Sequence, residues 1–171
     1  MTQELTDLRN YILEGRYDDA LSLLDELDGM SKKATLRAIK NFLIRMLIHL
    51  IKNQVEQRLT NSWAASIRDS IREIQDLNLK ENKTSYYIKQ EEWESYLENA
   101  FDDAVFAASV EVANGAYKPA QLIKIVDKTQ IINIANKLLN LTYSHAEKAL
   151  GDAISEEFSQ LPGGEDWNLE V

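Results

Sequence analysis

The sequence predicts an all-α protein, a single-domain helical bundle of about six to eight helices. Apolar residues recur at helical spacing in nearly every segment, and no segment alternates apolar and polar residues as a half-buried strand does. Only six glycines and two prolines occur among 171 residues, which indicates long helices with few connections. A chain of this length suits one domain with a sizeable core.

The first two expected helices meet at a sharp corner. Thr2 is a suitable cap for the first helix, which Gly15 ends, and a second short helix runs from Tyr17 to near Gly29. The string EGRYDDALSLLDEL, residues 14–27, resembles the middle of a tetratricopeptide repeat. A repeat array requires the signature again about 34 residues later, where His49 lies in an unbroken helical pattern. The string therefore predicts one tight turn between two helices.

A third helix is expected from Ser31, as its cap, to about Leu59, in the centre of the bundle. Its middle, NFLIRMLIHLI, is apolar nearly all round, which is typical of a helix buried on several sides. One narrow polar stripe remains, and its members are spaced by four, four, three and four residues: Asn41, Arg45, His49, Lys52 and Glu56.

The next two helices are separated by a polar loop. Asn61 or Ser62 is expected to cap a helix that reaches about Leu77, and KENKTS, residues 80–85, forms the loop. A long amphipathic helix follows, with an apolar face and a row of three acids on another face. The apolar face holds Trp93, Leu97, Ala100, Phe101, Ala104, Val105, Ala108 and Val112, and the acids are Glu94, Glu98 and Asp102.

The main break lies at NGAYKP, residues 114–119, where Gly115 suits a helix C-cap and Pro119 a first helical position. Apolar periodicity then continues to Leu139, with Thr129 dividing two short helices. Ser144 and Glu147 fit a capping box before the last helix. We expect a core bundle over 1–113, a helical extension packed on it over 114–160, and an irregular tail over 161–171 in which Trp167 can dock.

Charge is unevenly distributed along the chain, whose net charge is −9. Residues 31–72 hold nine basic and two acidic side chains, whereas the remainder holds ten basic and twenty-six acidic ones. One interpretation is a nucleic-acid surface at the start of the third helix, formed by Lys32, Lys33, Arg37 and Lys40. The other is a basic central segment that acidic neighbours surround inside one bundle, and the negative net charge favours it.

Several classes of protein are disfavoured. The absence of cysteine excludes disulfides and thiolate chemistry. The N-terminus lacks a basic start and an apolar run, and the longest apolar run, residues 42–51, is too short to span a membrane. We therefore expect a soluble cytoplasmic protein without a membrane partner.

Arg45 and His49 are the strongest catalytic candidates. They lie one helical turn apart, so a guanidinium could polarise a phosphate while an imidazole moves protons. Metal-independent ribonucleases of the all-helical HEPN class carry an Arg-to-His motif with four to six intervening residues, whereas this chain has three. The structural alternative is a buried ladder, in which Arg45 pairs with an acid of another helix and His49 bonds a backbone carbonyl.

No metal site or cofactor is expected. The only histidines are His49 and His145, in different helices, and no Glu-x-x-His pair occurs. The acidic row of Glu94, Glu98 and Asp102 is read as a solvated helix face. A glycine-rich phosphate loop is also lacking, since PGG at 162–164 is too short.

Two strings carry a recognisable family pattern: EGRYDDALSLLDELDGMSKKATLRAIK, and more strongly LIRMLIHLIKNQVEQRLTNSWAASIRDSIREI. The matching positions are His49, Leu50, Lys52, Ser62, Trp63, Ile67, Arg68 and Ile74. Through these features residues 8–113 resemble the domain of unknown function 29 family, which is bacterial and most common in cyanobacteria. Asn53 stands where the family often has an aromatic residue, and the part after Asn114 departs from its usual ending. The resemblance implies an all-helical fold and no established activity.

These observations favour a small non-enzymatic protein-interaction or regulatory module that binds a protein partner or a second copy of itself. One alternative is a ribonuclease-like or phosphotransfer enzyme that uses Arg45 and His49. Another is a nucleic-acid-binding module that uses the basic start of the third helix.

Overall fold

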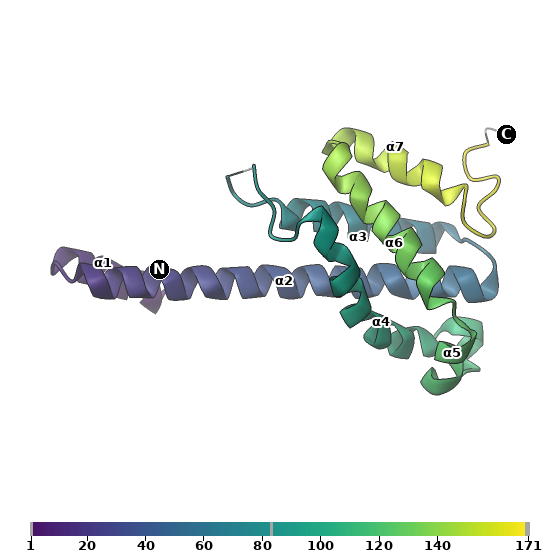
Figure 1. Ribbon diagram of the computed structural model, residues 1–171, viewed down its shortest axis with the longest axis horizontal. Coiled ribbons are helices and arrows are strands. Elements are labelled where there is room, and N and C mark those ends of the chain that lie inside the picture. Colours follow the sequence, from purple (N-terminus) through teal and green to yellow (C-terminus); the bar gives the residue numbers. More distant parts are fainter. Residues whose placement is uncertain (1, 83, 170–171) are drawn as a thin grey trace. The chain divides into compact units, whose positions relative to one another are not determined.

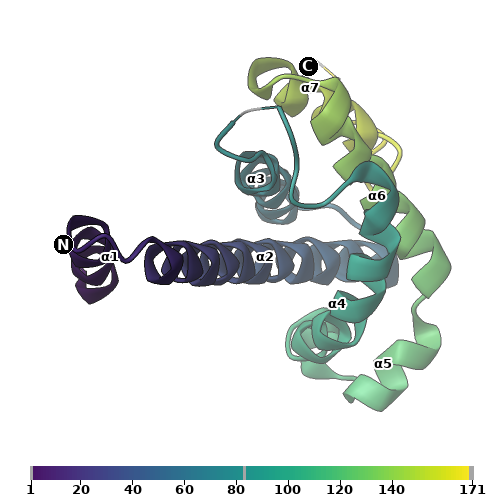
Figure 2. The ribbon, with the colours of Figure 1, turned by 60° about the vertical axis from the view of Figure 1, so that its left-hand side comes forward.

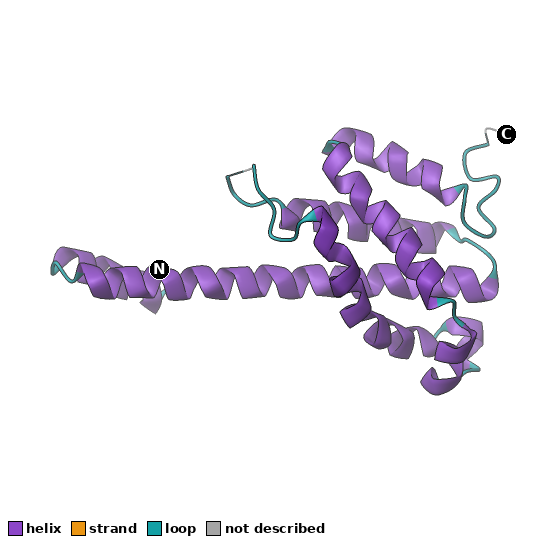
Figure 3. Cartoon of the chain, in the orientation of Figure 1, coloured by secondary structure: helices purple, strands orange, loops and turns teal. Residues whose placement is uncertain are grey.

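The computed structural model describes residues 2–82 and 84–169, and these residues form seven α-helices and no strand (Figures 1 and 3). The all-α prediction is confirmed. The chain divides into two compact units, residues 1–37 and 38–171, where the sequence predicted one domain. The helical bundle with a buried core lies in the second unit. In the described residues, no helix is long and apolar enough to cross a membrane.

The first unit is a helical hairpin made of α1 (Gln3–Leu13) and the beginning of α2 (Tyr17–Glu56). Thr2 caps α1 by accepting a hydrogen bond from the Leu5 amide at 3.4 Å. Gly15 has φ +72, a conformation open to glycine, and the turn predicted at this position is confirmed.

The expected division between a second and a third helix is wrong. α2 runs through Gly29 and Ser31 without interruption and ends at Glu56 rather than Leu59. A glycine inside a helix costs only about 1 kcal/mol relative to alanine, which cooperative helix formation on both sides offsets. A Cβ at Gly29 would meet no atom within 4 Å, so the glycine is not required there by close packing.

In the second unit, the part of α2 from residue 38 onward lies between α3 (Asn61–Asn78) and α4 (Trp93–Ser109) (Figure 2). The expectation of a central apolar helix holds for this part. It does not hold for residues 31–34 and Arg37, which are exposed. The α2 side chains that form the core here are Ile39, Leu43, Met46, Leu47, Leu50 and Ile51, each at most 2% exposed.

Thr60 caps α3, one residue before the predicted Asn61 or Ser62, by accepting a hydrogen bond from the Trp63 amide at 3.1 Å. After α4 the backbone turns at Ala113, Asn114 and Gly115, which all have positive φ. Pro119 begins α5 (Pro119–Ile125) as predicted. The break is therefore located where the sequence placed it.

The last helices, α6 (Lys128–Ser144) and α7 (Glu147–Phe158), pack against α3, and α6 also packs against α4. Asp127, not Thr129, separates α5 from α6, and its carboxylate accepts a hydrogen bond from the Gln130 amide. The predicted capping box of Ser144 and Glu147 is wrong, because Ala146 is the N-cap and has no side chain that could bond.

Candidate functional site

Arg45 and His49 lie one turn apart on α2, inside the second unit. Arg45 is exposed, and its Nη2 is 3.4 Å from Ser66 Oγ on α3. In the described residues Arg45 forms no ion pair within 4 Å. The acid partner expected for it is therefore replaced by a hydroxyl.

His49 is half-buried, and its Nδ1 is buried without a hydrogen-bond partner. The carbonyl expected to bond this atom is not in place. Burial lowers the pKa of His49 to about 4, and the positive charge of Lys52 adds to this effect, whereas Glu111 opposes it. The imidazole is thus neutral at pH 7, and a neutral imidazole with this pKa is a poor proton donor.

We expect the free energy of unfolding to decrease as pH falls from about 6.5 to about 4, in part because of His49. The folded pKa lies below the unfolded value of 6.5, so the unfolded state takes up a proton that the folded state does not hold. Above pH 6.5 the proton does not bind in either state, so the full free energy of unfolding is retained. This free energy falls as the pH drops from 6.5 through the folded pKa of about 4. Urea unfolding at several pH values measures this effect, and the free energy of unfolding should depend less steeply on pH in His49→Gln than in the natural sequence. Equal pH dependence in the two proteins would contradict the lowered pKa of His49.

Lys52 is the centre of a cluster that sequence reasoning did not find. Its Nζ is 2.9 Å from Glu111 Oε2 and 4.8 Å from the centre of the Trp63 ring. The Arg58 guanidinium lies 4.6 Å from the same ring centre. The hydrogen bond from Lys52 lowers the pKa of Glu111. Because Lys52 is 7% exposed, this cluster joins α2, α3 and the turn that follows α4 as a structural contact rather than an open site.

Sequence offers only a weak signal for this cluster. Lys52 and Trp63 both belong to the residues that carry the family resemblance, but neither periodicity nor charge pattern pairs them. Glu111 lies 59 positions beyond Lys52, and no local pattern indicates which acid of the chain reaches the buried ammonium.

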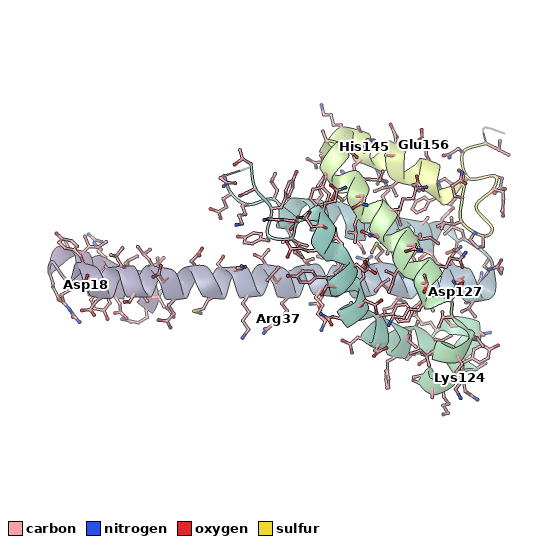
Figure 4. The ribbon with its side chains drawn as sticks, in the orientation of Figure 1. Asp18, Arg37, Lys124, Asp127, His145 and Glu156 are labelled. Carbon is pink, nitrogen blue, oxygen red and sulfur yellow. The ribbon has the colours of Figure 1, made fainter. Side chains whose placement is uncertain are left out.

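One cleft of the second unit has a volume of about 1110 Å³. It is bordered by α2, α3, the loop after α3, and the junction of α6 and α7, where Figure 4 labels His145. Charges of both signs line it: Arg45, Arg72, Lys80, Asp69, Glu73, Asp76, Glu81 and Glu147. Arg72 is 3.8 Å from Glu147. The mixed lining does not select one class of charged ligand.

The remaining candidates are surface residues. Glu94, Glu98 and Asp102 are exposed on α4, and Glu98 is bonded to Lys128 at 2.6 Å. Within the described residues, no group of three histidine or acidic side chains is placed to hold a metal ion.

The basic residues proposed for a nucleic-acid surface are exposed too. Lys32, Lys33 and Arg37 lie in the first unit, and Lys40 lies in the second, 3.7 Å from Asp103.

Residues 13–129 match the model of a protein family described as Domain of unknown function DUF29. The match covers more than half of the chain, including the Arg45 and His49 pair and the Lys52 cluster. It ends at the start of α6, so α6, α7 and the tail lie beyond it. Comparison with curated proteins and with solved structures finds no match.

Proposed function

The chain belongs to the DUF29 family, and we propose that it acts without catalysis, as a protein-interaction module whose first unit binds the partner. One observation carries the proposal. The hairpin of residues 1–37 has almost no core of its own, because Ala20 is its single buried apolar residue among those described.

The hairpin instead exposes large apolar side chains. Seven of the thirteen exposed ones in the described chain belong to this unit: Leu5, Ile12, Leu13, Tyr17, Leu21, Leu24 and Met30, which are 46% to 73% exposed. Scattered single apolar residues on a surface need no explanation, whereas their concentration in one unit without a core favours a surface that another protein covers. An exposed hairpin without a core also gains stability when a partner buries it.

The two alternatives find less support. An enzyme would need His49 to exchange protons near pH 7, but its lowered pKa and the burial of Nδ1 oppose that role. A nucleic-acid surface at Lys32, Lys33 and Arg37 would adjoin five acids on the same helix, between residues 18 and 28. Those acids would repel phosphates.

A co-purification experiment from the native host tests the proposal with the full chain as bait. We expect the double variant Leu21→Glu/Leu24→Glu to lose the partner that the natural sequence recovers, because charge cannot enter an apolar interface without a large desolvation cost. Ile125→Glu is the matched control, since Ile125 is 50% exposed on α5 of the second unit. Recovery of no protein partner at all, self-association included, or equal recovery by the double variant would rule the proposal out.

A further inference from the structure

The hairpin part of α2 carries opposite charges at its two ends. Residues 17–28 hold acidic side chains and no basic one: Asp18, Asp19, Asp25, Glu26 and Asp28. Residues 29–37 hold basic side chains and no acidic one: Lys32, Lys33 and Arg37. All eight are exposed. Such a helix is complementary in charge to a second copy of itself that runs in the opposite direction, whereas a parallel copy would place like charges together.

Three of the four large exposed apolar residues in this part of α2 lie on one face, and the fourth, Met30, lies on the opposite side. Tyr17, Leu21 and Leu24 are 64%, 59% and 46% exposed, and their spacing of four and three places them side by side. At 3.6 residues per turn, Asp28, Ser31 and Thr35 continue the same stripe within an arc of about 80°. The stripe is adjacent to the side on which Ala20, 4% exposed, is covered within the hairpin.

Asp25 and Lys32 lie together on the flank of this stripe that is opposite to Ala20. They are seven residues apart, which is two helical turns, and so keep nearly the same angular position. Among the described residues neither forms an ion pair. When two identical helices pair in antiparallel fashion about a two-fold axis, the same flank of each faces the other.

We propose that the first unit binds a second copy of this chain, with the two α2 segments antiparallel and the two-fold axis close to Gly29. Asp25 of each copy then faces Lys32 of the other, so the contact is made twice. The two Asp28 side chains lie next to the axis and therefore close to each other. The two Asp25–Lys32 pairs on the flank set the orientation of the helices, as charge pairs beside the seam of paired helices do. This inference rests on the proposed function and names its partner.

The dimensions suit such a pairing. The segment of α2 in the first unit has 21 residues, which span about 30 Å as a helix. Apolar residues of α1 add to the surface that a second copy can bury, among them Ile12 and Leu13 at 50% and 73% exposed. A pair of hairpins joined in this way contains four helices, the common number in helical bundles with a shared core.

Sedimentation equilibrium of the purified full chain tests the inference through a charge exchange. We expect a dimer for the natural sequence, weakening of at least tenfold in the dimer dissociation constant for Asp25→Lys and for Lys32→Asp, and recovery in the double variant Asp25→Lys/Lys32→Asp. The single variants place like charges opposite each other, and the double variant restores opposite charges with their positions exchanged. Raising the salt concentration should reduce the difference between the variants.

Glu26→Lys and Lys33→Asp form the matched control, because these residues have the same spacing of seven and lie one position further round the helix, away from the stripe. We expect them to leave the dimer within threefold of the natural sequence. A dimer that responds to the control pair and not to Asp25 and Lys32 would overturn the inference. So would a monomer at concentrations of order 100 µM.

Failure of the dimer proposal can be distinguished from failure of the proposed interaction role. If the chain is monomeric but co-purification still recovers a different partner that Leu21→Glu/Leu24→Glu abolishes, the second copy is the wrong occupant and the interaction role remains. If the chain is monomeric and no partner depends on the hairpin, both proposals are wrong.

Discussion

Replacing Trp93 by alanine is expected to lower the free energy of unfolding by about 3–5 kcal/mol, the range for a large aromatic removed from a packed core. Trp93 is 0% exposed at the start of α4. Its Nε1 donates a hydrogen bond of 2.7 Å to Tyr143 Oη on α6. The substitution therefore removes apolar contacts and also deprives a partly buried hydroxyl of one of its two donors.

The hydroxyl of Tyr143 is the centre of a hydrogen-bond network. It donates to the Ile88 carbonyl at 2.7 Å and accepts from Asn78 Nδ2 at 3.2 Å. Asn78 in turn accepts from the Ile88 amide at 2.7 Å and donates to its carbonyl at 2.9 Å. Burial raises the pKa of Tyr143 to about 12, so the group stays protonated and able to donate throughout the physiological range.

Guanidinium unfolding followed by circular dichroism will measure the Trp93→Ala effect. Tyr143→Phe is the first comparison, because it removes one oxygen and keeps the ring, and we expect a smaller loss of about 1–3 kcal/mol. Phe106→Ala is the exposed control at 66% exposure, and surface substitutions usually change stability by less than about 0.5 kcal/mol. A Trp93→Ala effect no larger than that of Phe106→Ala would refute the role assigned to this contact.

Asn53→Leu should lower the free energy of unfolding by about 2–3 kcal/mol, because it removes the donor from two part-buried hydrogen bonds to backbone carbonyls. Asn53 is 2% exposed on α2. Its Nδ2 donates to the Arg58 carbonyl at 3.0 Å and to the Pro162 carbonyl at 2.8 Å. The same side chain therefore closes the corner between α2 and α3 and holds the tail against it.

Hydrogen exchange will separate the two consequences of Asn53→Leu. We expect the amides of Gly164 and Trp167, which bond the carbonyls of Leu161 and Gly164, to exchange faster in the variant. Asn168→Ala is the control, since this exposed residue bonds only the Ser155 carbonyl, at 3.2 Å, among the described residues. Unchanged exchange in residues 161–169 of Asn53→Leu would show that the tail is held by other contacts.

The tail is fitted closely to the α2–α3 corner. A Cβ on Gly163 would lie 2.7 Å from the Arg58 Cα, and one on Gly164 would lie 2.0 Å from the Phe158 carbonyl oxygen. Both positions therefore require glycine. Trp167 packs edge-on against Phe158, with ring centres 5.3 Å apart, as the sequence suggested.

Helix faces could be predicted from the sequence because burial repeats with the helical period. The apolar residues named for the helix after the polar loop, from Trp93 to Val112, are all buried. Helix ends were less predictable. Gly29 does not end a helix, and the Ser144 pattern does not cap one, because single-residue preferences of about 1 kcal/mol yield to the helix and packing around them.

For the candidate site too, local features could be predicted from the sequence and long-range contacts could not. The spacing of Arg45 and His49 on one helix follows from the sequence alone, but the partners of these side chains do not. The contacts that decide the site join distant positions, such as Lys52 with Glu111 and Asn53 with Pro162. Local periodicity carries no information about which of many distant polar groups meets a buried one. The change from acidic to basic side chains within α2, between Asp28 and Lys32, is visible in the sequence. The proposal that this segment pairs with a second copy also needed the exposure of Tyr17, Leu21 and Leu24.

The tail contact bears on how this protein is made. The backbone of Arg58 and Leu59 is made well before its cover, residues 162–164, because Pro162 follows Asn53 by 109 positions. Chains fold from the N-terminus while they are being synthesised, so the corner stays uncovered until that segment has emerged. A product cut short before Pro162 keeps the seven α-helices of the described residues and lacks this cover, which makes it a target for cellular quality control.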